Sequence, residues 1–182
     1  MKFPDPMNDI ELLLERFRRG GELLAAVTTG AAGAELDFKG SDFPLSVRET
    51  IWLLADSEAM RRADLSRLLA EDRPQLLSIP SSQWAARLGY QKRKLSVGVE
   101  LFRTLRQHNH ELLKDLSGDD WQRSATLDGT PTTLAALLES AAAQTETMAL
   151  QVRELRQAYK AAKAAAANNE TKVETSAEEK KA

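Results

Sequence analysis

Residues 46–74, SVRETIWLLADSEAMRRADLSRLLAEDRP, contain the helix signal that decides the fold class of this chain. Ser46 and Glu49 have the spacing of a capping box, in which the hydroxyl and the carboxylate each accept from the other residue's backbone amide. An apolar stripe follows at helical spacing and is interrupted by one acid, Glu58. Its members are Val47, Ile51, Leu54, Glu58, Leu65 and Leu69. Pro74 closes the segment, because the residue before a proline disfavours helix. The sequence therefore predicts a long helix with a carboxylate on its buried side.

The segment before this helix also has an apolar stripe at helical spacing. Asn8 or Asp9 can cap it, since both side chains accept hydrogen bonds from a first helical turn. Gly20 and Gly21 interrupt it, and a glycine in a helix interior costs roughly 1 kcal/mol relative to alanine. The pair predicts a bend or weak point in this first helix.

Two more helical seams follow a long connection. Residues 95–116 have a leucine-rich seam in which Asn109 is the polar member: Leu95, Val99, Phe102, Leu105, Asn109, Leu112, Leu113 and Leu116. Thr132 or Thr133 can cap the last helix. Its seam advances by four and three residues, as side-by-side packing requires: Leu134, Leu138, Ala141, Thr145, Met148, Val152, Leu155 and Tyr159. An unpaired buried amide is costly, so Asn109 should have a partner on the second or the last helix.

Four amphipathic helices without a convincing strand predict an all-α bundle. The bundle should occupy residues 8–160, after an extended lead-in at residues 1–7 that contains two prolines. Large apolar residues almost cease after Tyr159, so too little surface can be buried there to offset the entropy of ordering. Residues 161–182 should therefore be a fraying helix end followed, from Asn168, by a disordered tail.

Composition excludes several classes of function. There is no cysteine, and hence no disulfide framework, thiolate metal site or cysteine nucleophile. A net charge of −2 argues against nucleic-acid binding, and no apolar run approaches the roughly 18 residues that cross a bilayer. The two histidines, His108 and His110, point roughly 200° apart on a helix and cannot bind one metal together. A cytoplasmic protein without membrane or nucleic-acid partners is expected.

The segment VRETIWLLADSE, residues 47–58, resembles the second-helix signature of the DinB/YfiT-like superfamily. The resemblance continues through LLAEDRP, WAARLGY, LFRTLRQHNHELL and QVRELR, in that order, and covers roughly residues 8–160. It implies a four-helix bundle of up-down-down-up topology that often forms a homodimer. It also implies a divalent metal such as zinc or nickel, held by one histidine on the second helix and two on the fourth.

The resemblance places those three histidine positions at Leu53, Gln144 and Met148. Leucine has no lone pair, a glutamine carbonyl is a weak oxygen donor, and the methionine thioether suits copper(I) rather than zinc or nickel. We therefore expect no metal and no other cofactor. The three positions become a candidate pocket instead, and the polar interior residues near it are Glu58, Asn109 and Thr145.

The function expected from these residues is that of a DinB-like domain without the metal site, acting as a non-catalytic small-molecule-binding or interaction module. The interior polar groups either satisfy one another by hydrogen bonds or line a ligand pocket. An alternative is a metal-dependent thiol transferase or hydrolase with substitute ligands among Asp56, Glu58 and Glu146. A purely structural helical partner protein is a third possibility.

Overall fold

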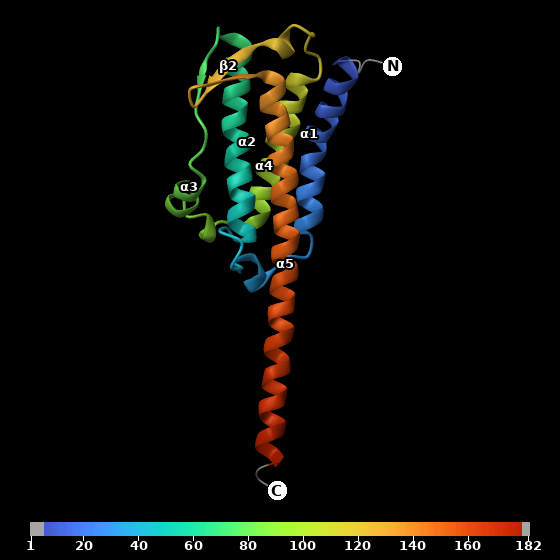
Figure 1. The fold of residues 1–182 in the computed structure, drawn as a ribbon, viewed down its shortest axis with the longest axis vertical. Helices are drawn as coiled ribbons and strands as arrows, with labels where there is room; N and C mark the ends of the chain where they lie inside the picture. The colour runs from blue at the N-terminus through green and yellow to red at the C-terminus, as the bar shows by residue number, and fades with distance from the viewer. Residues whose placement is uncertain (1–5, 180–182) are drawn as a thin grey trace.

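The computed structural model describes residues 6–179. Four long helices form the bundle: α1 (Pro6–Thr28), α2 (Val47–Ala70), α4 (Leu95–Leu113) and α5 (Leu134–Glu179). In Figure 1, α1 and α5 run in one direction while α2 and α4 run in the other, which is the predicted up-down-down-up order. Helix α2 packs extensively on α4 and less extensively on α5.

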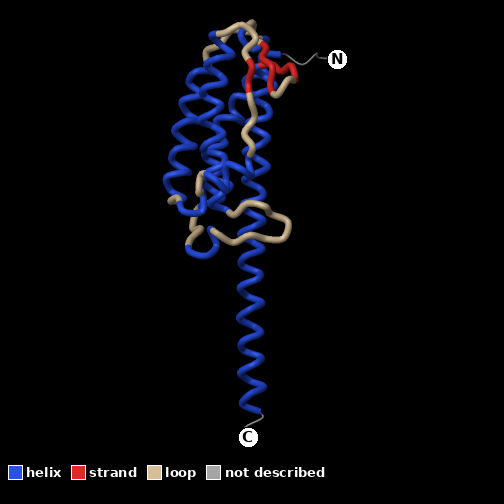
Figure 2. Tube along the Cα trace, turned by 90° about the vertical axis from the view of Figure 1, so that its left-hand side faces the viewer, coloured by secondary structure: helices blue, strands red, loops and turns tan. Residues whose placement is uncertain are grey.

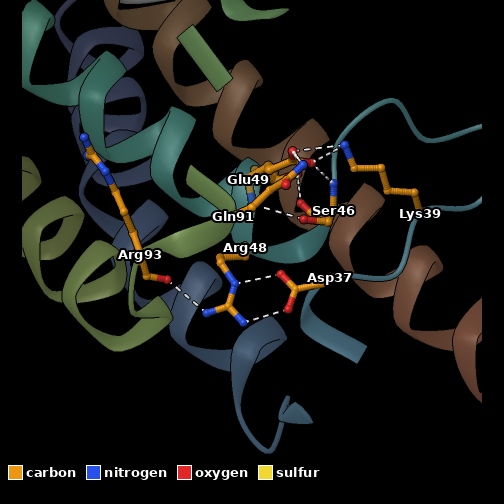
Figure 3. A network of polar contacts seen from close by, with 8 residues as sticks. Asp37, Lys39, Ser46, Arg48, Glu49, Gln91 and Arg93 are labelled. Atoms are coloured by element: carbon orange, nitrogen blue, oxygen red, sulfur yellow. Dashed lines mark hydrogen bonds and ion pairs between the residues drawn. The ribbon is translucent and has the colours of Figure 1, made fainter. Parts of the chain in front are cut away.

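The predicted capping box starts α2. The backbone N–H of Ser46 donates to Glu49 Oε2 at 2.8 Å, and the amide of Glu49 donates to Ser46 Oγ at 3.3 Å. Lys39 Nζ and Gln91 Nε2 also donate to the buried Glu49 carboxylate, at 3.0 and 2.9 Å (Figure 3). This cap therefore joins the connections that precede and follow α2.

Arg48 strengthens the same end of the bundle. Its Nε and Nη2 donate to the two carboxylate oxygens of Asp37 at 2.7 and 2.9 Å, and its Nη1 donates to the carbonyl oxygen of Arg93 (Figure 3). The Arg48 guanidinium lowers the pKa of Asp37. Arg48 thus links the first turn of α2 to the segment that immediately precedes α4.

The connection from α2 to α4 runs along the outside of α2, from one end of the bundle to the other (Figure 1). It contains strand β1 (Gln75–Leu76), helix α3 (Ser81–Arg87) and the short 3-10 helix η2 (Tyr90–Lys92). Ser81 is the first residue of α3, which has no side-chain cap. Trp84 packs against the core cluster around Ile51 and so anchors this connection to the bundle.

A small sheet lies at one end of the bundle (Figure 2), although no strand was predicted from the sequence. Strand β1 pairs in parallel with β2 (Ser124–Leu127), which pairs antiparallel with β3 (Thr130–Thr133). Asp128 and Gly129 join β2 to β3, with φ angles of 49° and 82°. Two positive φ angles at an Asp-Gly pair are typical of a two-residue hairpin turn. The strands escaped detection because four residues are too few to show a clear alternation.

The ends of the other elements follow their local chemistry. The amide of Ala136 donates to Thr133 Oγ1 at 3.2 Å, so Thr133 caps α5 as predicted. Helix α4 ends at Leu113, three residues before the predicted end. Helix α1 begins at Pro6, so neither Asn8 nor Asp9 is its cap, and only residues 1–5 of the predicted lead-in precede it, which lie outside the described residues. Two further 3-10 helices lie in the connections: η1 (Gly33–Leu36) and η3 (Asp120–Gln122).

Each of two predicted core seams is shifted by one residue at one position. Arg106 and Ala149 are buried, whereas their neighbours Leu105 and Met148 are only partly buried. In a helix of 3.6 residues per turn, adjacent positions compete for the inward direction, and the neighbouring helices decide between them. The shift matters most at Arg106, because it brings a charged side chain into the core.

Helix α5 extends well beyond the bundle (Figure 1). Its Tyr159 ring meets Phe38 edge-on with centroids 5.4 Å apart, and residues 160–168 are exposed. The helix continues to Glu179, where the sequence analysis expected a disordered tail from Asn168. Alanine, lysine and glutamate dominate this run and have high intrinsic helix propensity, which favours a helical backbone there.

None of the described helices is both long and apolar enough to cross a membrane.

Candidate functional site

A buried ion pair lies at the centre of the bundle. Arg106 Nη2 on α4 donates to Glu58 Oε2 on α2 at 2.9 Å, and both side chains are 1% exposed. Asn109 Nδ2 donates to the other carboxylate oxygen of Glu58 at 2.8 Å. The prediction that Asn109 has a buried partner on the second or the last helix is therefore confirmed, and the partner is Glu58.

Arg106 also connects α4 to the other two helices. Its Nη1 donates to the carbonyl oxygen of Phe17 at 2.8 Å, and its Nη2 donates to Thr145 Oγ1 at 3.0 Å. The guanidinium lies 3.9 Å from the centroid of the Phe17 ring and 4.6 Å from that of Phe102, so both rings face a cation. Burial lowers the pKa of Arg106, and the Glu58 carboxylate opposes that shift. We call Glu58, Arg106, Asn109 and Thr145 the central cluster.

Arg106 was not among the site residues predicted from the sequence. A usable signal was present, because Arg106 lies one turn after Phe102 and three residues before Asn109 on the same helical face. Gly20 on α1 provides the space for it: a Cβ atom there would lie 2.8 Å from Arg106 Nη1 and 3.1 Å from Thr145 Cγ2. Helix α1 is continuous through Gly20 and Gly21. At Gly20 the absence of a side chain allows Arg106 and Thr145 to pack closely against the helix.

Leu53 and Met148 line a hollow of about 200 Å³ between α2 and α5. We call it the apolar hollow, because most of its wall consists of large apolar side chains: Phe43, Pro44, Leu45, Leu53, Met148, Val152 and Leu155. Thr50, Ser81 and Gln151 supply its polar groups. The structure thus brings together two of the three predicted pocket residues.

Gln144 lies in a second hollow of about 180 Å³, which also lies between α2 and α5. We call it the polar hollow, because five of its lining side chains, on α2 and α5, are polar or charged: Ser57, Arg61, Asp64, Ser140 and Gln144. The connection after α2 supplies a further wall with Leu77, Ser78 and Ile79. The two linings share Ser81 but follow one another along α2, the apolar hollow beside Thr50 and Leu53 and the polar hollow beside Ser57 to Asp64. We call the two hollows together the α2–α5 groove.

Arg61 links the polar hollow to the central cluster. Its Nε donates to Glu58 Oε2 at 3.3 Å, and its Nη2 donates to Gln144 Oε1 at 3.2 Å. One turn farther along α2, Asp64 lines the same hollow, and burial raises the pKa of its carboxyl group against the opposing effect of Arg61 and Arg67. Neither Arg61 nor Asp64 was singled out as a site residue from the sequence.

Comparison with known proteins identifies the fold. No protein-family model matches the chain, and no curated protein matches its sequence. Among solved structures, YfiT from Bacillus subtilis superposes with a TM-score of 0.80 over 88% of this chain and 93% of that chain, at 17% sequence identity. The fold is that of a YfiT-like four-helix bundle. This confirms the fold class and helix order expected from the resemblance. YfiT itself is described as "a probable metal-dependent hydrolase with an unusual four-helix bundle topology".

The residues of this YfiT-like bundle do not fit a divalent metal at the three resemblance positions. Leu53 offers no donor atom, and Met148 beside it offers only a thioether. The Gln144 carbonyl oxygen lies in the other hollow and accepts from Arg61. Within residues 6–179, no group of three or more histidine, aspartate or glutamate side chains could hold a metal ion.

The three alternative metal ligands considered from the sequence, Asp56, Glu58 and Glu146, each bind a different protein group in this YfiT-like bundle. Asp56 accepts from the Tyr90 hydroxyl at 2.6 Å, and Glu146 pairs with Arg16 at 2.8 Å. Glu58 belongs to the central cluster. The two histidines stay apart from the groove residues, since neither lines either hollow.

Proposed function

We propose that this YfiT-like bundle is a metal-free module that binds a small molecule in the α2–α5 groove, and that it is not a metal-dependent enzyme. The observation that supports this is the donor chemistry at the three resemblance positions. Leu53 and Met148 face an apolar hollow, while the Gln144 carbonyl oxygen already accepts a hydrogen bond from Arg61. The hydrolase chemistry attributed to YfiT would need metal ligands that these side chains do not supply.

The groove has the features expected of a ligand site. It combines apolar walls with a few converging polar groups, as small-molecule sites usually do. Met60 and Leu77 line the polar hollow and are 36% and 71% exposed, although both are large and apolar. Exposed apolar side chains beside a recess favour a binding site. A cytoplasmic location and assembly as a homodimer belong to the same proposal, and rest on composition and on the resemblance.

Elemental analysis of the untagged protein, purified without added metal, tests the proposal. We expect far less than one equivalent of zinc or nickel. A metal bound tightly to the native state would add stability by mass action, so EDTA should leave the melting temperature unchanged and added zinc or nickel should not raise it. Near-equimolar zinc or nickel in the parent protein would overturn the proposal in favour of a metal-dependent enzyme.

A triple variant provides the positive control for this measurement. Leu53→His, Gln144→His and Met148→His together restore the three imidazoles that the resemblance implies. This variant should acquire metal that the parent lacks, and its melting temperature should then respond to EDTA.

A further inference from the structure

We propose that the polar hollow of the α2–α5 groove recognises a free α-amino acid with an apolar side chain, with the ligand carboxylate at Arg61, its ammonium group at Asp64 and its side chain against the apolar wall of the same hollow. This inference rests on the proposed function, because it names the class of ligand for the same groove. Two oppositely charged residues of the polar hollow, Arg61 and Asp64, have hydrogen-bonding capacity that the described part of the chain does not use.

Arg61 has donor capacity left for a ligand. Its Nε and Nη2 are engaged with Glu58 and Gln144, but its Nη1 has no hydrogen-bond partner among the described residues. The side chain is 16% exposed and lines the polar hollow. Moreover, Arg61 shares the carboxylate of Glu58 with Arg106 and makes no ion pair with any other carboxylate among the described residues. A ligand carboxylate would accept from Nη1.

Asp64 lacks both a hydrogen-bond donor and a positively charged ion-pair partner among the described residues. Opposite charges three residues apart on a helix commonly pair, yet Arg61 is directed toward Glu58 and Gln144 and makes no ion pair with Asp64. No donor among the described residues hydrogen-bonds to the Asp64 carboxylate, which is partly buried and has a raised pKa as a result. A partly buried carboxylate without a donor is unfavourable. A ligand ammonium group would supply both the charge and the hydrogen bonds.

The two residues together select a zwitterion over a simple ion. A lone anion at Arg61 would be repelled by Asp64, and a lone cation at Asp64 would be repelled by Arg61. The polar hollow, of about 180 Å³, also has an apolar wall, which includes Met60, Leu77 and Leu137. An aliphatic side chain can lie against this wall while the charged groups of the ligand meet Arg61 and Asp64. Leucine therefore matches the polar hollow in charge and in the character of its walls.

Isothermal titration calorimetry with L-leucine tests the inference, using two analogues that each lack one charge. The compound 4-methylpentanoate has no ammonium group, and 3-methylbutylamine has no carboxylate. We expect saturable binding of leucine, and binding at least about tenfold weaker for each analogue, because each loses a charge-assisted hydrogen bond. Leucine that fails to bind, or an analogue that binds as tightly as leucine, would overturn the inference.

A matched pair of variants locates the site. Asp64→Asn should weaken leucine binding about tenfold or more, whereas Asp72→Asn should leave it unchanged. Asp72 follows α2, is exposed and lines neither hollow, and its variant makes the same change in charge. Circular dichroism and melting temperature establish that both variants are folded. Equal weakening by the two variants would show that leucine binds elsewhere.

The failure of this inference is distinguishable from the failure of the proposed function. Absence of leucine binding in a protein that holds no metal overturns only the choice of ligand. Stoichiometric zinc or nickel in the same preparation overturns the metal-free module itself.

Discussion

Two of the carboxylates on helix α2 lie in different environments, Glu58 in the central cluster and Asp64 in the polar hollow. Glu58 is 1% exposed, and both of its oxygens accept from buried donors on α4. Asp64 lies less than two turns away and accepts from no donor in the described part of the chain. Glu58 faces the closely packed α4, whereas Asp64 faces the hollow between α2 and α5.

The difference shows how one helix can serve both stability and binding. A buried charge is tolerated where partners from other helices complete its hydrogen bonds, and removal of one partner is then costly. A charge without such partners contributes little to the fold and remains available to a ligand. The predictions below test this contrast, from the largest expected effect to the smallest.

The largest effect is expected from Glu58→Ala. This change leaves the Arg106 guanidinium buried without its counter-ion, which should lower the free energy of unfolding by about 3–5 kcal/mol. Urea denaturation followed by circular dichroism measures it. Glu139→Ala is the control, because it removes an exposed ion pair with Arg16 and should cost less than about 1 kcal/mol. Similar losses from the two variants would contradict the role of the central cluster.

Gly20→Ala should have the next largest effect. The new Cβ atom would lie 2.8 Å from Arg106 Nη1, so the cluster must shift, and overpacking of this kind costs typically about 1–3 kcal/mol. The adjacent Gly21→Ala is a matched control. Its Cβ atom would make an ordinary contact 3.4 Å from Arg103 Cγ, and alanine gains up to about 1 kcal/mol of helix propensity. Equal destabilisation by both variants would show that Gly20 does not make room for Arg106.

Asp64→Asn should have a smaller effect with the opposite sign. Burial raises the folded-state pKa of Asp64, so its ionisation disfavours the folded state, and the cost appears as pH rises from about 4 through that raised pKa. Asparagine avoids this cost at neutral pH. The ligand-free variant should therefore melt slightly above the parent at pH 7, and the difference should vanish below about pH 3.5. A lower melting temperature at pH 7 would show that Asp64 stabilises the fold.

Deletion of residues 168–182 should have the smallest effect. Residues 160–168, which lead into this segment, are exposed, so the change in unfolding free energy should stay within about 0.5 kcal/mol. Circular dichroism should show less helix without a lower melting temperature, since α5 continues to Glu179. A loss of several degrees, or a change of oligomeric state by light scattering, would show that this end of α5 makes stabilising contacts.

The sequence by itself determined where α2 and α5 begin and which helix faces are apolar, because capping and amphipathic spacing are local properties. The capping box at Ser46, the cap at Thr133 and the buried positions of Glu58 and Asn109 were all predictable for that reason. The strands were not, since an Asp-Gly turn between two short segments predicts a hairpin only weakly.

Only the tertiary structure decided how the polar groups are paired. Adjacent helical positions differ too little in direction for spacing alone to choose Arg106 over Leu105, and the space at Gly20 on another helix made that choice. For the same reason Gln144, one turn before Met148 on α5, lines the polar hollow with Arg61 and Asp64 and not the apolar hollow with Leu53 and Met148. Partners of a buried charge come from residues distant in the sequence, so their identity depends on how the four helices pack against one another.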